Sequence, residues 1–119
     1  MITETREITF SPDSLIEAIL AHFRTLKQPL PSGDILGISL GQDPEITITL
    51  TLKLAETSKE KRIVVRPAVA GAAMIAYCKR NNIPVPRSGV KSLMVSGDSL
   101  SLVISTGGRP TALFEVEDA

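Results

Sequence analysis

The chain has 119 residues, of which 43% are hydrophobic but only 3% aromatic, and its 13 basic and 13 acidic side chains balance to a formal net charge of zero. This length and composition predict one domain over residues 1–119 with an aliphatic core, and they disfavour a globally basic nucleic-acid-binding protein. The single cysteine, Cys78, excludes an intrachain disulfide and a cysteine-based zinc site.

The chain carries no sign of a membrane segment. Its first residues lack the basic and then apolar regions of a signal peptide. The longest apolar run, from Ala68 to Cys78, is about half the roughly 20 residues that a membrane span needs. We therefore expect a soluble, cytoplasmic protein with no membrane partner.

An internal repeat appears when the sequence is aligned with itself so that Ile8 lies on Ile63. Ile8–Pro12 then lies on Ile63–Pro67, and Pro29–Pro31 lies on Pro84–Pro86, so that three prolines coincide. Prolines are rare and restrict the backbone, so their coincidence favours duplication over chance similarity between two amphipathic stretches.

Each copy is expected to fold as a β-α-β-β unit. In chain order, the first copy (about 7–54) should contain a strand at 7–10, a helix from Pro12, and strands at 35–40 and 45–54. The second copy (about 62–105) should contain a strand at 62–66, a helix at 67–80, and strands at 90–95 and 100–105, followed by a C-terminal strand at about 111–116. One extra residue in the first copy would place Ile46 and Ile48 opposite Leu100 and Leu102.

Local signals support these elements. Ser11 is expected to cap the first helix, whereas Arg66 leaves the second without a side-chain cap. Each Pro-X-Pro segment should stop its helix and lead into an extended strand. Together the patterns predict an α+β fold in which two tandem repeats form one pseudo-two-fold domain, with a mostly antiparallel sheet and two helices on one face. They leave open whether the strands form one sheet or two.

The chain offers no constellation that suggests catalysis, and we expect a protein that is not an enzyme. The only histidine, His22, lies in the middle of the first helix, and Cys78 lies on a core-facing position of the second, where a buried and inert thiol is expected. Asp13 and Glu17 share a helix face but belong near the positive end of the helix dipole. Short glycine turns lie between strands rather than before helices, so no phosphate loop is expected. No catalytic residue, metal or cofactor is predicted.

The second helix is unusual because small residues surround it. Such a helix allows another backbone to approach closely, which suits packing on the first helix or contact with a second copy of the chain. For the second interpretation, the candidate self-association residues are Gly71, Ala72, Met74 and Ile75.

Charge is divided between the copies. Residues 1–60 hold 5 basic and 9 acidic side chains, and residues 61–119 hold 8 and 4. The basic side chains of the second copy that surround its helix end form a candidate patch for a polyanion or a partner: Lys79, Arg80, Arg87 and Lys91. The alternative is that they are solvated charges near a helix C-terminus, where cations are favoured. Such asymmetry can also drive head-to-tail association.

These observations favour a non-enzymatic binding or adaptor module that acts through protein contacts and forms a homo-oligomer. Two alternatives stay open. One is binding of nucleic acid or another polyanion through the basic patch, which the scarcity of aromatic residues makes less favoured for single strands. The other is binding of a small molecule in a groove between the copies.

Overall fold

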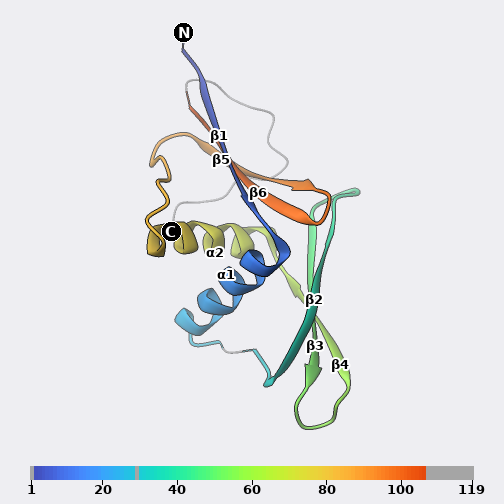
Figure 1. Cartoon of the computed structure of the whole chain (residues 1–119). Helices are drawn as coiled ribbons and strands as arrows, with labels where there is room; N and C mark the ends of the chain where they lie inside the picture. The colour runs from blue at the N-terminus through green and yellow to red at the C-terminus, as the bar shows by residue number, and fades with distance from the viewer. Residues whose placement is uncertain (1, 29, 107–119) are drawn as a thin grey trace.

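The computed structural model describes residues 2–28 and 30–106 of the chain (Figure 1). The elements in chain order are β1 (Glu4–Phe10), α1 (Pro12–Thr25), β2 (Gly33–Gly41), β3 (Thr47–Leu54), β4 (Glu60–Val65), α2 (Pro67–Arg80), β5 (Val90–Ser96) and β6 (Ser99–Thr106). The predicted α+β class and the repeated β-α-β-β order are confirmed. The C-terminal strand expected at 111–116 lies outside the described residues.

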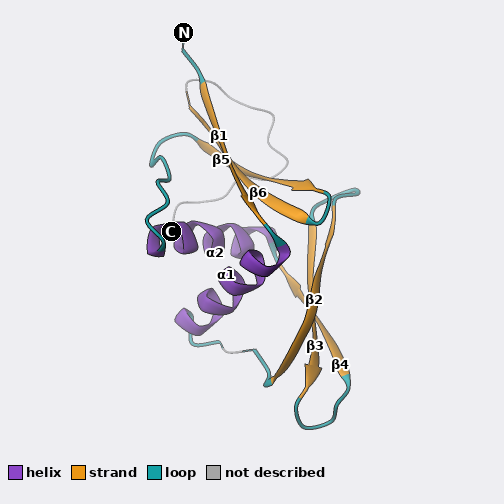
Figure 2. Cartoon of the chain, in the orientation of Figure 1, coloured by secondary structure: helices purple, strands orange, loops and turns teal. Residues whose placement is uncertain are grey.

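The strands form two antiparallel three-stranded sheets rather than one, with the orders β1-β6-β5 and β2-β3-β4 (Figure 2). Each sheet takes a hairpin from one copy and its third strand from the other. Thus β1 of the first copy pairs with β6 of the second, and β4 of the second pairs with β3 of the first. The two copies are therefore interlocked, and neither holds all three strands of a sheet.

Of the elements in the two copies, the helices α1 and α2 correspond to each other most closely. Both α1 and α2 have 14 residues, and they begin at the equivalent prolines Pro12 and Pro67. The Ser11 side chain accepts a hydrogen bond from the Ser14 backbone N–H at 3.3 Å, as expected of an N-cap, whereas Arg66 makes no such bond. Both predictions about the caps are confirmed.

The third strands align differently from the prediction. Ile48 faces Leu40 and Val65, whereas Leu100 faces the equivalent residues Val95 and Phe10. The expected match of Ile46 with Leu100 is therefore wrong, and Ile48 is the residue equivalent to Leu100. The first copy accordingly contains three extra residues before this point instead of the expected one.

The difference arises in the hairpin turns. In the second copy only two residues separate β5 from β6, and Gly97 takes the first position with φ +61°. Glycine reaches this conformation without the penalty of a Cβ atom, as a tight two-residue hairpin requires. In the first copy residues 42–46 join β2 to β3, which accounts for the longer connection.

One continuous core lies between the helices and the inner faces of both sheets. The two helices pack on each other, and Ala18 and Ala73 are fully buried at equivalent positions. Small side chains there let the helix backbones approach closely. The core is aliphatic, as expected, and is completed by buried side chains from both helices and from β3, β4, β5 and β6: Leu15, Ile19, Ile48, Val65, Met74, Ile75, Leu93, Leu100, Leu102 and Ile104.

The molecule is elongated, with principal extents of 58 × 30 × 19 Å, because the two sheets extend in different directions from the helices (Figure 1). In the described part of the chain, no helix combines the length and apolar character needed to cross a membrane.

Candidate functional site

The candidate self-association residues on α2 lie mostly inside the molecule. Gly71, Met74 and Ile75 are buried, and Ala72 is half-buried. The helix packs against α1, β3 and β5 of its own chain. The buried residues of α2 thus serve packing within the chain, and self-association through this helix stays a prediction.

The four residues of the candidate basic patch differ in their exposure to solvent. Lys79, Arg80 and Arg87 are exposed, whereas Lys91 is only 5% exposed. Its ammonium group donates a hydrogen bond to the Arg87 carbonyl oxygen at 3.2 Å. A buried charge of this kind needs such partners. Lys91 therefore supports the loop before β5, and the exposed basic surface consists of the other three residues.

Arg80 is held beside aromatic rings at the end of α2. Its guanidinium carbon lies 5.8 Å from the centroid of the Tyr77 ring, a distance typical of a cation–π contact. The Tyr77 ring in turn packs against the Phe10 ring in a T-shaped arrangement, with a centroid distance of 5.4 Å. This chain of contacts joins the surface cation to the end of β1.

The structure adds a cation that the sequence did not suggest. Across the helix-facing side of the β1-β6-β5 sheet, Arg6 and Lys91 both face Ile104. These three residues come from three strands and both copies. Sequence patterns could not place Arg6 beside the second copy, because only the exchange of first strands brings it there.

Besides burial, the positive charge of Arg6 also affects the pKa of Cys78, which lies on α2. Burial raises the pKa of the Cys78 thiol above its ordinary value of 9.0, and the positive charge of Arg6 opposes this rise in part. Cys78 is fully buried and forms no disulfide, so the expectation of a buried thiol is confirmed. A thiol with a raised pKa holds its proton and is a poor nucleophile.

The histidine and the two acidic side chains singled out in the sequence all lie on α1. His22 is half-buried on α1, and Asp13 and Glu17 are exposed on the same helix. Among residues 2–28 and 30–106, no group of three histidine, cysteine or acidic side chains is arranged to hold a metal ion.

The outer strands β1 and β4 carry opposite charges at equivalent positions. Glu7 on β1 faces Val103 of β6, and Arg62 on β4 faces Thr51 of β3. Both charged side chains are exposed. On β4, Val64 is 71% exposed, an unusual position for a large aliphatic side chain.

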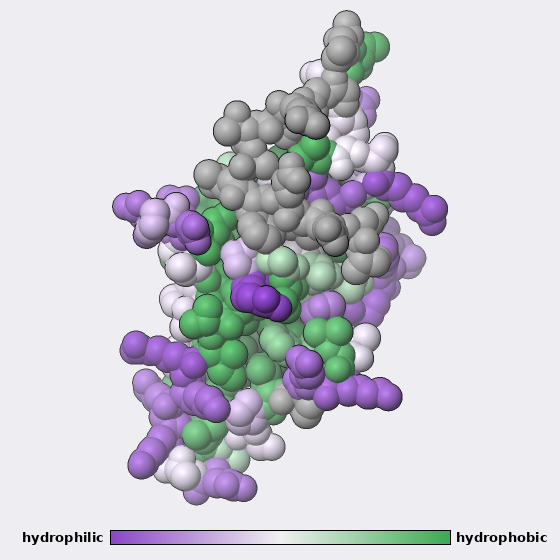
Figure 3. Space-filling view, turned by 180° about the vertical axis from the view of Figure 1, so that it is seen from behind, coloured by the Kyte–Doolittle hydropathy of each residue, from purple (hydrophilic) through white to green (hydrophobic). Residues whose placement is uncertain are grey.

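An apolar pocket of about 310 Å³ lies between the end of α1 and the start of β2. Its walls include Leu20, Phe23, Leu30 and Ile35. From behind, the molecule shows apolar surface bordered by hydrophilic residues (Figure 3).

Comparisons with known proteins give no further guide to this surface. No protein-family model matches the chain, and neither the curated proteins nor the solved structures contain a significant match to it.

Proposed function

We propose that this protein is a non-enzymatic binding module that assembles head to tail, with β1 of one copy beside β4 of the next. The observation that carries the proposal is the opposite charge of these two outer strands. β1 holds two carboxylates and one guanidinium, whereas β4 holds two cations and one carboxylate.

Both strands have an edge that can accept another strand. Within the described residues, β1 pairs only with β6 and β4 only with β3. The outer edge of such a strand presents backbone N–H and C=O groups that can pair with a further strand. The exposed Val64 adds an apolar side chain on the β4 edge.

A specific antiparallel register would use these features. With Glu7 opposite Arg62, Thr5 lies opposite Val64. All four side chains then project from the outer faces, because their partners Val103, Ser105, Thr51 and Thr49 do so in the existing sheets. Opposite charges on paired strands stabilise a sheet by about 0.2–1 kcal/mol per pair.

The symmetry of this contact decides the form of the assembly. Because β1 of one copy meets β4 of another, the contact is heterologous, and each added copy leaves one free β1 and one free β4. Such contacts produce a closed ring or an open chain rather than a simple two-fold dimer. The buried α2 residues take no part.

Light scattering after size-exclusion chromatography, over a range of protein concentrations, tests the assembly. Glu7→Lys and Arg62→Glu should each place like charges opposite each other and weaken association by about 1 kcal/mol, or roughly fivefold in Kd. An equal mixture of the two variants should regain association, because the exchanged charges match again at every contact.

Matched controls lie on α1, where Glu17→Lys and Arg24→Glu make the same charge changes at exposed positions away from both edges. They should leave association unchanged, and higher salt should weaken it in the unmodified protein. A monomer at every concentration, or equal effects of edge and control variants, contradicts the proposal.

Polyanion binding is the second candidate, supported by the three exposed cations Lys79, Arg80 and Arg87 at the end of α2 and in the loop that follows. It predicts that the protein binds a labelled oligonucleotide at low salt and that affinity falls steeply as salt rises. Arg87→Ala should weaken this binding, whereas no binding at low salt removes the candidate.

A further inference from the structure

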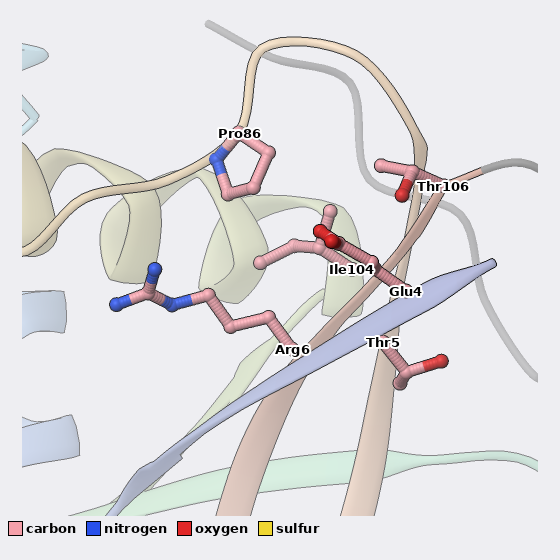
Figure 4. A pocket seen from close by; sticks show the side chains of 6 residues that line it. All are labelled: Glu4, Thr5, Arg6, Pro86, Ile104 and Thr106. Atoms are coloured by element: carbon pink, nitrogen blue, oxygen red, sulfur yellow. The ribbon is translucent and has the colours of Figure 1, made fainter. Parts of the chain in front are cut away.

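We propose that two pockets between the copies bind small zwitterions of the α-amino acid class, a function separate from self-association. The first pocket, of about 310 Å³, lies beside β1 (Figure 4). Its lining residues are Glu4, Thr5, Arg6, Pro86, Ile104 and Thr106. The Thr5 side chain points to the opposite side of the strand from Pro86, so Thr5 contributes mainly its backbone (Figure 4).

The second pocket, of about 360 Å³, lies at the far end of the other sheet. Its lining residues are Pro31, Ser32, Leu54, Glu56, Thr57 and Lys61. Both pockets combine one cation, one carboxylate, a proline ring, an aliphatic side chain and at least one hydroxyl group.

The repeat explains much of this likeness. Arg6 and Lys61 occupy equivalent positions under the alignment that superposes α1 on α2, and the same alignment places Pro31 on Pro86. The third strands end at Leu54 and Thr106, which are equivalent in the alignment of those strands. In each pocket, the cation comes from one copy and the proline from the other. The exchange of first strands therefore brings the cation and the proline together in both pockets, whereas the carboxylates come from different places, Glu4 from β1 and Glu56 from the turn between β3 and β4.

The mixture of charges selects the ligand class. A lone cation would favour any small anion, but the carboxylate of Glu4 or Glu56 in the same pocket repels one. A molecule that carries separate positive and negative groups can satisfy both side chains, and its carboxylate can form a charge-assisted hydrogen bond with Arg6 or Lys61. Selection against singly charged analogues follows from the unpaired charge that each would leave.

The neutral walls favour an aliphatic side chain on the ligand. Ile104 is almost fully buried beneath the first pocket, and Pro86 faces it from the loop before β5 (Figure 4). The guanidinium of Arg6 extends from β1 toward α2 in the same view. The Ile104 side chain beside it therefore forms an apolar wall of the pocket. Leu54 and Pro31 supply the corresponding apolar surface in the second pocket.

The size of the pockets suits a small ligand. Both volumes lie at the lower end of the range of about 300–1,000 Å³ that is usual for small-molecule sites. A ligand of amino-acid size has few atoms with which to gain binding energy, so we expect a Kd of about 1 mM.

An NMR titration of the isotope-labelled full chain tests the proposal with three probes: L-leucine, N-acetyl-L-leucine, which lacks the positive charge, and L-leucinamide, which lacks the negative charge. Leucine should shift the backbone signals of Arg6 and Thr106, and separately those of Thr57 and Lys61. The two singly charged analogues should bind at least several-fold more weakly.

Variants separate the two pockets. Arg6→Gln should abolish the shifts at Thr106 but retain those at Thr57, and Lys61→Gln should do the reverse. Lys53→Gln, at an exposed position on the outer face of β3, is the control and should change neither set. Because Arg62→Glu is expected to disrupt self-association, the same titration in that variant keeps the two proposals distinguishable.

Three results would overturn the proposal: no shifts with leucine at millimolar concentrations, equal shifts with either singly charged analogue, or shifts confined to residues away from both pockets. Retention of leucine binding in the Arg62→Glu variant supports pockets that work in the single chain.

Discussion

Ile48 and Leu100 occupy the same place in the two halves of the fold. Each lies on the central strand of its sheet, faces a first strand from the other copy, and is fully buried. Ile48 faces Val65, and Leu100 faces Phe10, at equivalent positions of β4 and β1. The pair marks where the exchanged strands join the common core.

Truncation at either position should therefore destabilise the domain by a similar amount. Ile48→Ala and Leu100→Ala each remove buried methyl groups from a closely packed site, and we expect a loss of about 2–5 kcal/mol in the free energy of unfolding. Leu36→Thr, at an exposed position of β2 outside the proposed association edge, should change it by less than about 0.5 kcal/mol. Urea unfolding followed by circular dichroism measures all three. A large loss at only one of the two buried positions would contradict their equivalence.

The helix caps provide a second comparison between the copies. Ser11→Ala removes the side chain that accepts the Ser14 N–H and should cost about 1 kcal/mol. Arg66→Ser places a capping hydroxyl at the equivalent position before α2 and should stabilise the protein by about 0.5–1 kcal/mol. Thermal unfolding should show a lower Tm for the first variant and a higher Tm for the second. A fall in Tm with Arg66→Ser would show that the arginine makes a contact that stabilises the protein more than a capping hydrogen bond does.

The sequence predicted local structure better than the pairing of distant strands. Proline at the first position and the Pro-X-Pro segment after the helix predicted α2 at residues 67–80, as observed, because these signals act on the local backbone. The third strands were misaligned, with Ile46 rather than Ile48 placed on Leu100, since strand alternation has a period of two and both isoleucines satisfy it. Only the pairing with strands of the other copy fixes the register.

The candidate site was harder to predict for a related reason. A lysine near the start of a strand is normally solvated, and nothing near Lys91 in the sequence indicates that its ammonium group meets the Arg87 carbonyl in a buried position. Arg6 and Lys61 belong to the pockets only because each first strand crosses to the other copy. The charge split was visible in the sequence, but the opposite charge of β1 and β4, the outer strands of the two sheets in the described part of the chain, was not.

Cys78 should give the protein a specific sensitivity to high pH. Burial raises the pKa of the thiol in the folded state above the ordinary value of 9.0, so the folded state binds its proton more tightly than the unfolded state. This contribution to stability is complete below pH 9 and is lost as pH rises through the raised pKa. Urea unfolding at pH 7 and pH 10 should therefore show a smaller decline for Cys78→Ala than for the unmodified protein. The native thiol should also react slowly with a thiol reagent, and equal declines with pH in both proteins would contradict the burial effect.

Separation of the two copies should test their interlocking. A cut in the turn between β3 and β4, at Glu56, leaves β1 without β6 and β4 without β3, which are the pairings that join the copies. Neither fragment, 1–56 or 57–119, should fold as a monomer, because each lacks the third strand of its sheet and half of the core. An equimolar mixture should regain the helical circular dichroism signal as a one-to-one complex, as measured by analytical ultracentrifugation. Since the copies share one topology, a fragment that does fold alone should do so only as a pair of identical chains with exchanged first strands. Cooperative unfolding of a monomeric 1–56 fragment would show that the exchange is not required for stability.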